Sequence, residues 1–111
     1  MTVSIMQGDS FAVFLNLMQD GAVLTPHLLN ELEIFVGDAL RFSYSEGTVK
    51  YDSSSQQWYI WPTQKQTFDL EEGSYKVEVR VKYKDDKATS VKGYTIADRI
   101  KVVSAVSREV L

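Results

Sequence analysis

Two acidic residues, Glu31 and Glu33, stand two positions apart in a stretch that alternates between polar and apolar residues. On a β-strand both side chains leave the same face, about 6.6 Å apart along the backbone. That separation lies in the range of the two carboxylates of an inverting glycosidase. We favour the other interpretation, in which two solvated carboxylates lie on the exposed face of a half-buried strand. His27, the one histidine, has no serine, aspartate or second histidine beside it, so a polar turn residue is favoured over a catalytic base.

Other residue types that carry chemistry are absent or explained by turns. The chain has no cysteine, which excludes disulfides, thiolate zinc sites and cysteine nucleophiles. No glycine-rich phosphate loop or nucleophile elbow occurs. The aspartates lack the alternating loop of a calcium site and fit turn chemistry instead: Asp9, Asp20, Asp38, Asp85 and Asp86. We therefore predict that the protein is not an enzyme and has no catalytic, cofactor-binding or metal-binding residues.

Aromatic residues occupy both faces of one predicted strand, at Trp58, Tyr59 and Trp61. One face of the strand must join the core. The other face either shows an aromatic side chain to solvent or is covered by a loop, and sandwiches commonly bury a tryptophan between their sheets. Because exposed aromatic side chains bind sugars and proteins, we include all three residues in a candidate interaction surface.

A second candidate surface is a stripe of four basic residues on one face of a predicted strand, interrupted only by Glu78. We call it the basic ribbon: Lys76, Arg80, Lys82 and Lys84. It fits either contact with an acidic protein surface or an edge strand that lysines protect from aggregation. A nucleic-acid partner is disfavoured, because the net charge of −3 gives no wider basic footprint.

Charge is divided unevenly along the chain. Residues 1–40 hold five acidic and no basic residues, a net charge of −5, whereas residues 41–111 have a net charge of +2. The two parts are expected to attract each other, within one fold or between copies of the chain.

The length of 111 residues and the hydrophobic fraction of 44% predict one domain, residues 1–111, with its own core. The longest apolar run is too short to span a bilayer, and no basic segment precedes an apolar one at the N-terminus. We therefore expect neither a transmembrane segment nor a signal peptide, and no membrane partner.

The elements that must position these residues are strands, because the dominant hydrophobic period is two. The clearest alternation runs from Tyr75 to Tyr83, and another covers 31–36. Strands separated by turns, with no helical stretch of ten residues, predict an all-β antiparallel sandwich or small barrel. We favour the sandwich, for which the usual size is seven to nine strands. At most one short helical turn is expected, near residues 26–30.

The hairpin after Tyr83 has a register that the apolar pattern predicts. A three-residue loop of Asp85, Asp86 and Lys87 places Val81 opposite Val91, whereas a two-residue turn would place it opposite a serine. We therefore expect the longer, bulged hairpin.

The segment Leu70–Tyr75 reads Leu-Glu-Glu-Gly-Ser-Tyr. It is similar to the L-x-x-G-x-Y corner of immunoglobulin-like sandwiches, in which a tyrosine entering a late strand ties the preceding corner by its hydroxyl. Gly73 and Tyr75 are therefore predicted to form a structural corner, with Tyr75 mostly buried.

The order of short motifs along nearly the whole chain resembles a group of small proteins encoded in tailed phages and prophages of Gram-positive gut bacteria. More distantly, it resembles the N-terminal immunoglobulin-like domains of phage upper baseplate proteins. The motifs that carry the resemblance are Gly8-Asp9, Asp20-Gly21, Leu24-Thr25-Pro26, Glu31-Leu-Glu-Ile, Tyr51-Asp52 to Trp58, Gln66-Thr67-Phe68, Val79-Arg-Val-Lys and Ser107-Arg-Glu-Val-Leu.

The resemblance implies a non-enzymatic virion structural or accessory protein, associated with a tail or baseplate. Its partners would be other phage structural proteins or further copies of itself. It would lie in the virion, or in the bacterial cytoplasm when expressed from a prophage. The alternative is a carbohydrate-binding module that uses exposed aromatics around Trp58–Trp61.

Overall fold

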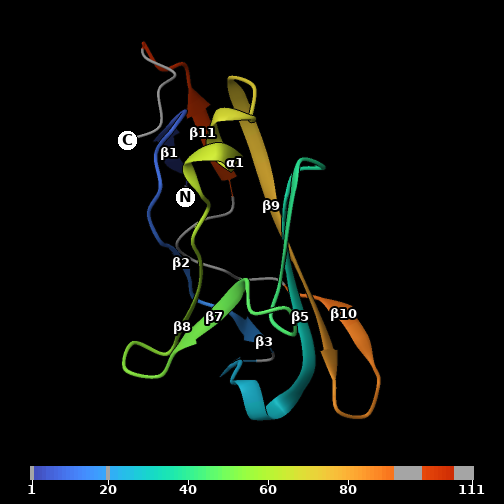
Figure 1. Cartoon of the computed structure of the whole chain (residues 1–111). Coiled ribbons are helices and arrows are strands. Elements are labelled where there is room, and N and C mark those ends of the chain that lie inside the picture. The colour runs from blue at the N-terminus through green and yellow to red at the C-terminus, as the bar shows by residue number, and fades with distance from the viewer. Residues whose placement is uncertain (1, 20, 92–98, 107–111) are drawn as a thin grey trace.

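The structure is a computed structural model that describes residues 2–19, 21–91 and 99–106. In these residues the regular elements are almost all strands (Figure 1). The elements in chain order are β1 (Thr2–Met6), β2 (Val13–Leu15), β3 (Met18–Gln19), β4 (Ala22–Val23), the 3₁₀ turn η1 (Pro26–Leu28), β5 (Leu29–Val36), β6 (Leu40–Ser43), β7 (Val49–Asp52), β8 (Gln57–Ile60), the helix α1 (Gln64–Phe68), β9 (Gly73–Tyr83), β10 (Ala88–Ser90) and β11 (Arg99–Val103).

The strands form one large sheet, one small sheet and a short hairpin. The large sheet has the order β1-β11-β9-β5-β6, and β10 also pairs with β9. The small sheet has the order β2-β8-β7, and β3 pairs with β4. Every described pairing is antiparallel except that of β1 with β11, which is parallel. The prediction of an all-β, mainly antiparallel chain is confirmed.

The long strand β9 organises the large sheet. It pairs with β5 over Val77–Tyr83, with β10 over Arg80–Lys82 and with β11 over Gly73–Lys76. In Figure 1 it crosses most of the molecule, with β5 beside one part and β11 beside the other. Its alternation is as predicted: the valines at 77, 79 and 81 are buried and the residues between them are exposed.

Buried residues from both larger sheets belong to one hydrophobic cluster. The large sheet contributes Ile34 and Val79, and the small sheet contributes Leu15, Trp58 and Ile60, none of them more than 1% exposed. The inner faces of the two sheets therefore share one core, as apolar faces of twisted sheets must to escape water.

Two details of the predicted architecture are wrong. The described residues contain eleven strands rather than seven to nine, partly because β3 and β4 are two-residue strands of a local hairpin. The predicted helical turn is present as η1, but a second turn, α1, follows β8. Its residues 64–68 are too few to show a helical hydrophobic period.

The hairpin between β9 and β10 has the predicted loop length but another register. Its loop is Lys84–Asp86 and its register places Val81 opposite Thr89 rather than Val91. The reason is turn chemistry: Asp86 adopts a left-handed φ of 68°, which suits the third position of a three-residue loop with a bulge. The predicted strand beyond Val91 falls on residues 92–98, outside the described residues.

The predicted corner at the start of β9 is present. The Tyr75 hydroxyl donates to the Glu71 carbonyl oxygen at 2.7 Å. Its ring packs beside Gly37, where an added Cβ would approach Tyr75 Cδ1 to 3.0 Å. Tyr75 is half-buried rather than mostly buried, because its ring lies at the margin of the hydrophobic cluster. Within the described residues, no helix is long and apolar enough to cross a membrane.

Candidate functional site

Strand β8 separates the aromatic residues that the sequence grouped together. Trp58 is fully buried, and its indole Nε1 donates to the Leu24 carbonyl oxygen at 2.9 Å. Its ring also packs against Tyr44 and Tyr51, with centroids 5.3 and 5.0 Å away. Placing Trp58 on an interaction surface was therefore wrong, because it is the face of β8 bearing Trp58 that joins the core.

Tyr59 and Trp61 lie on the other side of the strand. The Tyr59 ring is half-buried beside Phe14 of β2, with ring centroids 5.0 Å apart. Trp61 is 58% exposed, the most exposed aromatic side chain in the described part of the chain. These two members of the predicted surface are therefore available to a partner.

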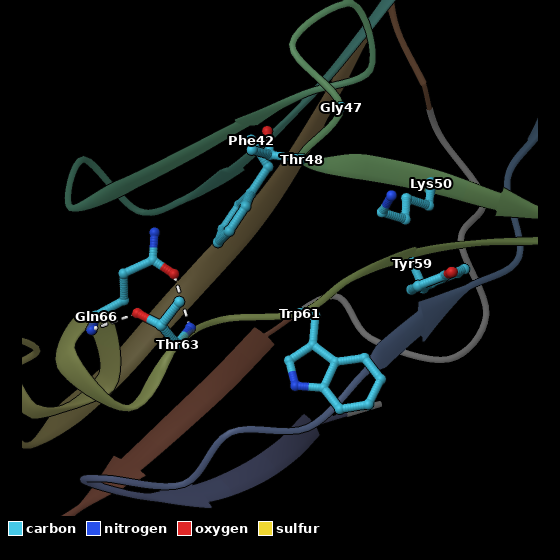
Figure 2. Close-up of a pocket in the computed structure, with 8 residues that line it drawn as sticks. All are labelled: Phe42, Gly47, Thr48, Lys50, Tyr59, Trp61, Thr63 and Gln66. Carbon is cyan, nitrogen blue, oxygen red and sulfur yellow. Dashed lines mark hydrogen bonds between the residues drawn. The ribbon is translucent and has the colours of Figure 1, made fainter. Parts of the chain in front are cut away.

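Tyr59 and Trp61 line a hollow of about 320 Å³, shown in Figure 2. The figure shows the indole of Trp61 face-on, with Lys50 and Tyr59 on one side and Thr63 and Gln66 on the other. We call this the aromatic hollow; its lining residues are Phe42, Gly47, Thr48, Lys50, Tyr59, Trp61, Thr63 and Gln66.

The indole of Trp61 is held in place by a neighbouring loop. Trp61 Nε1 donates to Ser10 Oγ at 3.1 Å, and Ser10 Oγ donates in turn to the Pro62 carbonyl oxygen at 2.8 Å. An exposed side chain fixed in this way loses less conformational freedom when a partner binds.

The helix α1 supplies another wall of the aromatic hollow. Its first turn is a capping box: Thr63 Oγ1 accepts from the Gln66 backbone N–H, and Gln66 Oε1 accepts from the Thr63 N–H at 2.8 Å. Thr67 anchors the helix from behind, accepting from the Gly8 N–H and donating to the Asp9 carbonyl oxygen. The side chain of Gln66 is therefore held in a defined position.

A second, more open hollow of about 620 Å³ adjoins the first, because Gly47, Lys50 and Tyr59 line both. Its other lining residues are Pro26, Tyr44, Ser45, Val49 and Tyr51. Lys50 therefore stands where the two hollows meet, directly across from Tyr59 in the β7–β8 register.

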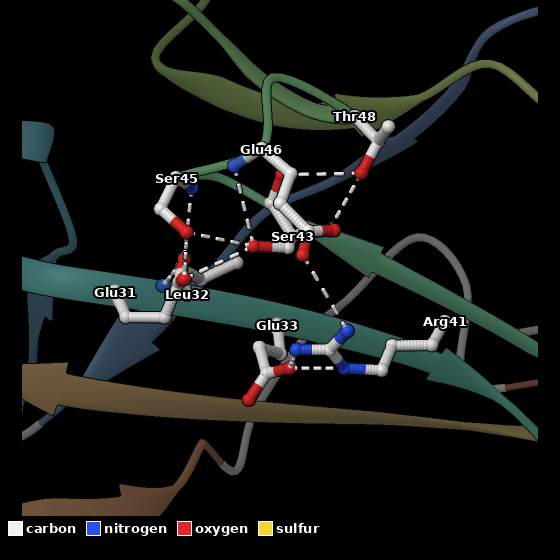
Figure 3. A network of polar contacts seen from close by, with 8 residues as sticks. All are labelled: Glu31, Leu32, Glu33, Arg41, Ser43, Ser45, Glu46 and Thr48. Carbon is white, nitrogen blue, oxygen red and sulfur yellow. Dashed lines mark hydrogen bonds and ion pairs between the residues drawn. The ribbon is translucent and has the colours of Figure 1, made fainter.

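A network of polar side chains surrounds the 44–48 turn (Figure 3). It fixes the position of Gly47 and Thr48, which form one wall of the aromatic hollow. The Glu31 carboxylate accepts from the Ser43 hydroxyl, the Ser45 hydroxyl and the Ser45 N–H. Thr48 Oγ1 accepts from the Ser43 N–H at 2.7 Å and donates to the Ser43 carbonyl oxygen at 3.1 Å. The turn is therefore fixed to β5 and β6 by side chains as well as by backbone pairing.

The network also changes the acidity of Glu31. Partial burial acts to raise the pKa of the Glu31 carboxyl group. The hydrogen bonds donated by Ser45, by the Leu32 N–H and by Ser43 outweigh that effect, so the pKa is lowered from its ordinary value of 4.5.

Glu31 and Glu33 are not arranged as a catalytic pair. Both are half-buried on the exposed side of the large sheet, and each has its own partner. Glu33 is bound by the Arg41 guanidinium, while Glu31 is bound by the serines of the turn (Figure 3). The favoured interpretation was two solvated carboxylates on the exposed face of a strand. They do lie on the side of β5 away from the core, but they are half-buried and bound by neighbouring groups.

Three members of the basic ribbon, Lys76, Arg80 and Lys82, lie on the exposed face of β9, as the alternation predicts. The fourth, Lys84, was wrongly placed on the strand: it is exposed in the loop that follows β9. However, β9 is paired on both edges, by β5 and by β10, so protection of an edge strand does not explain the ribbon. The register places Glu33 beside Arg80 and Glu31 beside Lys82. Acidic residues of the N-terminal part thus lie next to basic residues of the C-terminal part within one sheet.

The members of the ribbon differ in their partners. Lys76 lies 3.8 Å from Glu78, and Lys82 lies 3.7 Å from Asp86, both as exposed ion pairs. Within the described residues, Arg80 and Lys84 take part in no ion pair.

The remaining candidates have local roles. His27 is exposed in η1, with its Nδ1 3.0 Å from Thr25 Oγ1. Asp9 accepts from the Met6 N–H and Asp85 from the Lys87 N–H, as turn residues do. Asp20 lies outside the described residues, and the described residues contain no cluster of acidic or histidine side chains that could hold a metal ion.

The sequence did not indicate Lys50, Thr48 or Gln66 as lining residues of the hollow. Two local signals would have identified Lys50 and Gln66. The spacing Thr63-x-x-Gln66 is that of a capping box. A hairpin closed by Asp52 and Gln57 places Lys50 beside Tyr59. Comparisons of the chain with protein-family models, curated proteins and solved structures gave no match.

Proposed function

We propose that the chain is a non-enzymatic structural or accessory protein of a phage or prophage, associated with a tail or baseplate, that acts through protein–protein contacts. The order of motifs along the sequence supports the phage context. In that role the protein lies in the virion, or in the bacterial cytoplasm when a prophage expresses it.

The strand pairing supports an immunoglobulin-like sandwich as the fold of this module. The pairing β2-β8-β7 in one sheet and β11-β9-β5-β6 in the other follows the order expected for such a topology. The bond from the Tyr75 hydroxyl to the Glu71 carbonyl, at the entry to β9, corresponds to a tyrosine corner.

The observation that carries the contact role is the basic ribbon around Arg80. Arg80 is exposed at the centre of a sheet, and the acidic residue beside it, Glu33, is already bound by Arg41. A guanidinium with five donors and no acidic partner in the described residues suits a carboxylate on another protein chain.

Particle purification tests this function. The prophage that encodes the chain is induced, particles are purified, and the chain is sought by mass spectrometry and by immunogold labelling. We expect the chain to co-purify with tails and to be released as ionic strength rises. Its absence from particles, together with a failure to associate with itself or with any virion protein, would contradict the proposal.

Carbohydrate binding is the second candidate, favoured by one observation: Trp61 is 58% exposed beside Tyr59 in the aromatic hollow. A flat aromatic face exposed next to polar groups suits the apolar face of a sugar ring. A glycan array tests it, with Trp61→Ala as the comparison. If the wild-type protein binds no glycan on the array, this candidate is removed, and the contact role is unaffected.

A further inference from the structure

We infer that the aromatic hollow binds a pyranose ring bearing an anionic group, with the Trp61 indole as the stacking surface and the Lys50 ammonium as the counter-charge. This inference rests on the carbohydrate-binding candidate and is independent of the contact role.

Several polar atoms in the hollow remain open to a ligand. Gln66 Oε1 is taken by the Thr63 N–H, so Gln66 offers its Nε2 with two donors. Thr48 Oγ1 accepts from and donates to the Ser43 backbone, so its single donor is used and one acceptor lone pair is left. Lys50 adds three donors and no acceptor. The open groups are mainly donors, which suits a ligand rich in acceptor oxygens.

The charge of the lining residues favours an anionic ligand. Among the residues that line the two adjoining hollows, Lys50 is the one charged side chain, and no aspartate or glutamate is present. Lys50 forms no ion pair within the described residues. A carboxylate or phosphate group on the ligand would therefore meet a cation with no competing acidic group.

The size and shape of the hollow suit a single sugar ring. The hollow of about 320 Å³ is at the lower end of the range of small-ligand sites, roughly 300–1,000 Å³. The Trp61 face shown in Figure 2 provides a flat apolar surface between Lys50 and Gln66. One sugar ring can cover the indole while its substituents reach the donors at either side.

Strand pairing argues against the addition of a peptide strand beside Tyr59, whereas β7, which carries Lys50, is an edge of the small sheet. Strand β8, which carries Tyr59, is hydrogen-bonded to β2 on one edge and to β7 on the other. It therefore presents no row of unpaired backbone groups of the kind that captures a peptide strand. A ligand that depends on side-chain donors and an aromatic face fits better.

The test is a titration of the full chain with glucuronic acid, glucose 6-phosphate and glucose, followed by backbone amide NMR shifts and tryptophan fluorescence. We expect at least one anionic sugar to bind about tenfold more tightly than glucose, which corresponds to one charge-assisted contact. Binding of glucuronic acid alone assigns a carboxylate, and binding of glucose 6-phosphate alone assigns a phosphate. Binding of both assigns an anionic group in general.

Variants separate the two contributions. Trp61→Ala should abolish binding of every sugar, and Lys50→Gln should remove the preference for the anionic sugars while glucose affinity stays unchanged. The control is Lys65→Gln, an exposed lysine of α1 that does not line the hollow, and it should bind like the wild type. NMR spectra of each free variant establish that it is folded.

Three results would overturn the inference. Equal affinity for glucose and the anionic sugars would show that the hollow has no preference for an anionic group, although carbohydrate binding would remain supported. An equal loss of binding in Lys65→Gln and Lys50→Gln would reveal a general charge effect. Absence of binding by all three sugars, or tighter binding of a short acidic peptide, would remove the sugar as occupant while particle association tests the contact role separately.

Discussion

Glu31 accepts hydrogen bonds from both the backbone N–H and the hydroxyl group of Ser45, a residue 14 positions further along the chain. The contact joins a central strand, β5, to the turn that follows β6. Gly47 and Thr48 of the same turn line the aromatic hollow. A carboxylate on β5 thus fixes a wall of a site that also includes Lys50 and Tyr59 of the other sheet.

Replacement of Glu31 should therefore destabilise the fold in a pH-dependent way. Glu31→Gln should lower the free energy of unfolding at neutral pH by about 1.5–2 kcal/mol. This is the lower part of the roughly 1.5–3 kcal/mol that hydrogen bonds to charged groups contribute, because Glu31 is only half-buried. Because folding lowers the pKa of Glu31, its stabilising effect is complete above pH 4.5 and is lost as the pH falls through the folded-state pKa. Urea denaturation of both proteins at pH 7 and in acid measures this.

The matched control for that experiment is Glu78→Gln, which alters an exposed carboxylate 3.8 Å from Lys76. It should change stability by less than about 0.5 kcal/mol at either pH. A difference between wild type and Glu31→Gln that stays constant into acid would show that the charge of Glu31 is not what Ser45 binds.

The corner at Tyr75 makes a second prediction. Tyr75→Phe removes the hydroxyl that donates to Glu71 and should cost about 1–2 kcal/mol. The control is Tyr51→Phe, whose hydroxyl forms no hydrogen bond within the described residues. Chemical denaturation midpoints decide: equal midpoints for Tyr75→Phe and wild type would mean that the corner bond does not stabilise the fold.

Two glycines with left-handed backbone separate conformational strain from crowding. Gly8 has a φ of 92° and an added Cβ would lie 2.5 Å from Phe68 Cζ, whereas Gly47 has a φ of 81° and no atom within 4 Å. Gly47→Ala should cost about 1 kcal/mol. Gly8→Ala should cost about 2–4 kcal/mol, because overlap with the ring adds to the strain. Similar thermal midpoints for the two variants would show that Phe68 moves away freely.

The two tryptophans predict two distinct fluorescence signals. Trp61→Phe leaves only the buried Trp58, so its emission should be blue-shifted and resistant to acrylamide. Trp58→Phe leaves only the exposed Trp61, so its emission should be quenched readily if the variant folds. Ready quenching of Trp61→Phe in its folded state would contradict the burial of Trp58.

The basic ribbon predicts salt-sensitive association. Reversal of Arg80 and Lys82 to Glu places the new carboxylates beside Glu33 and Glu31, so it should lower stability by about 0.5–2 kcal/mol and abolish complexes that an acidic surface forms with the ribbon. Reversal of Lys50 and Lys65 gives the same change in net charge elsewhere on the molecule and should leave association intact. Sedimentation velocity at low salt and at about 0.5 M salt, where the Debye length is about 4 Å, measures both. Association that is unchanged by salt and by the reversal of Arg80 and Lys82 would show that the ribbon is a solvated face without a partner.

Local patterning predicts the strands better than it predicts their neighbours. The alternation in 77–81 identified the buried and exposed faces of β9, because the side-chain period of a strand is two. The same stretch gave no indication that β9 is central. Its pairing with β5 and β11 joins residues far apart in sequence, and no local pattern records such pairing.

Other misses came from the short range of the signals used. Alternation places Trp58 and Tyr59 on opposite faces but does not say which face is inside, and that depends on the partner strands of β8. In the β9–β10 hairpin, the apolar match of Val81 with Val91 was outweighed by the left-handed backbone of Asp86. The aromatic hollow needs side chains from β7, β8 and α1 together, so its full lining follows only from the assembled fold.

The parallel pairing of β1 with β11 has a mechanical consequence. Five residue pairs, from Thr2 with Arg99 to Met6 with Val103, join the first described strand to the last. When force pulls the start of one strand and the end of its parallel partner apart, it loads all the hydrogen bonds between them together, in shear. Antiparallel neighbours pulled from one end would instead open bond by bond. A chain stretched between residues 2 and 103 is therefore expected to resist tension at this pair before any other strand of the large sheet is loaded.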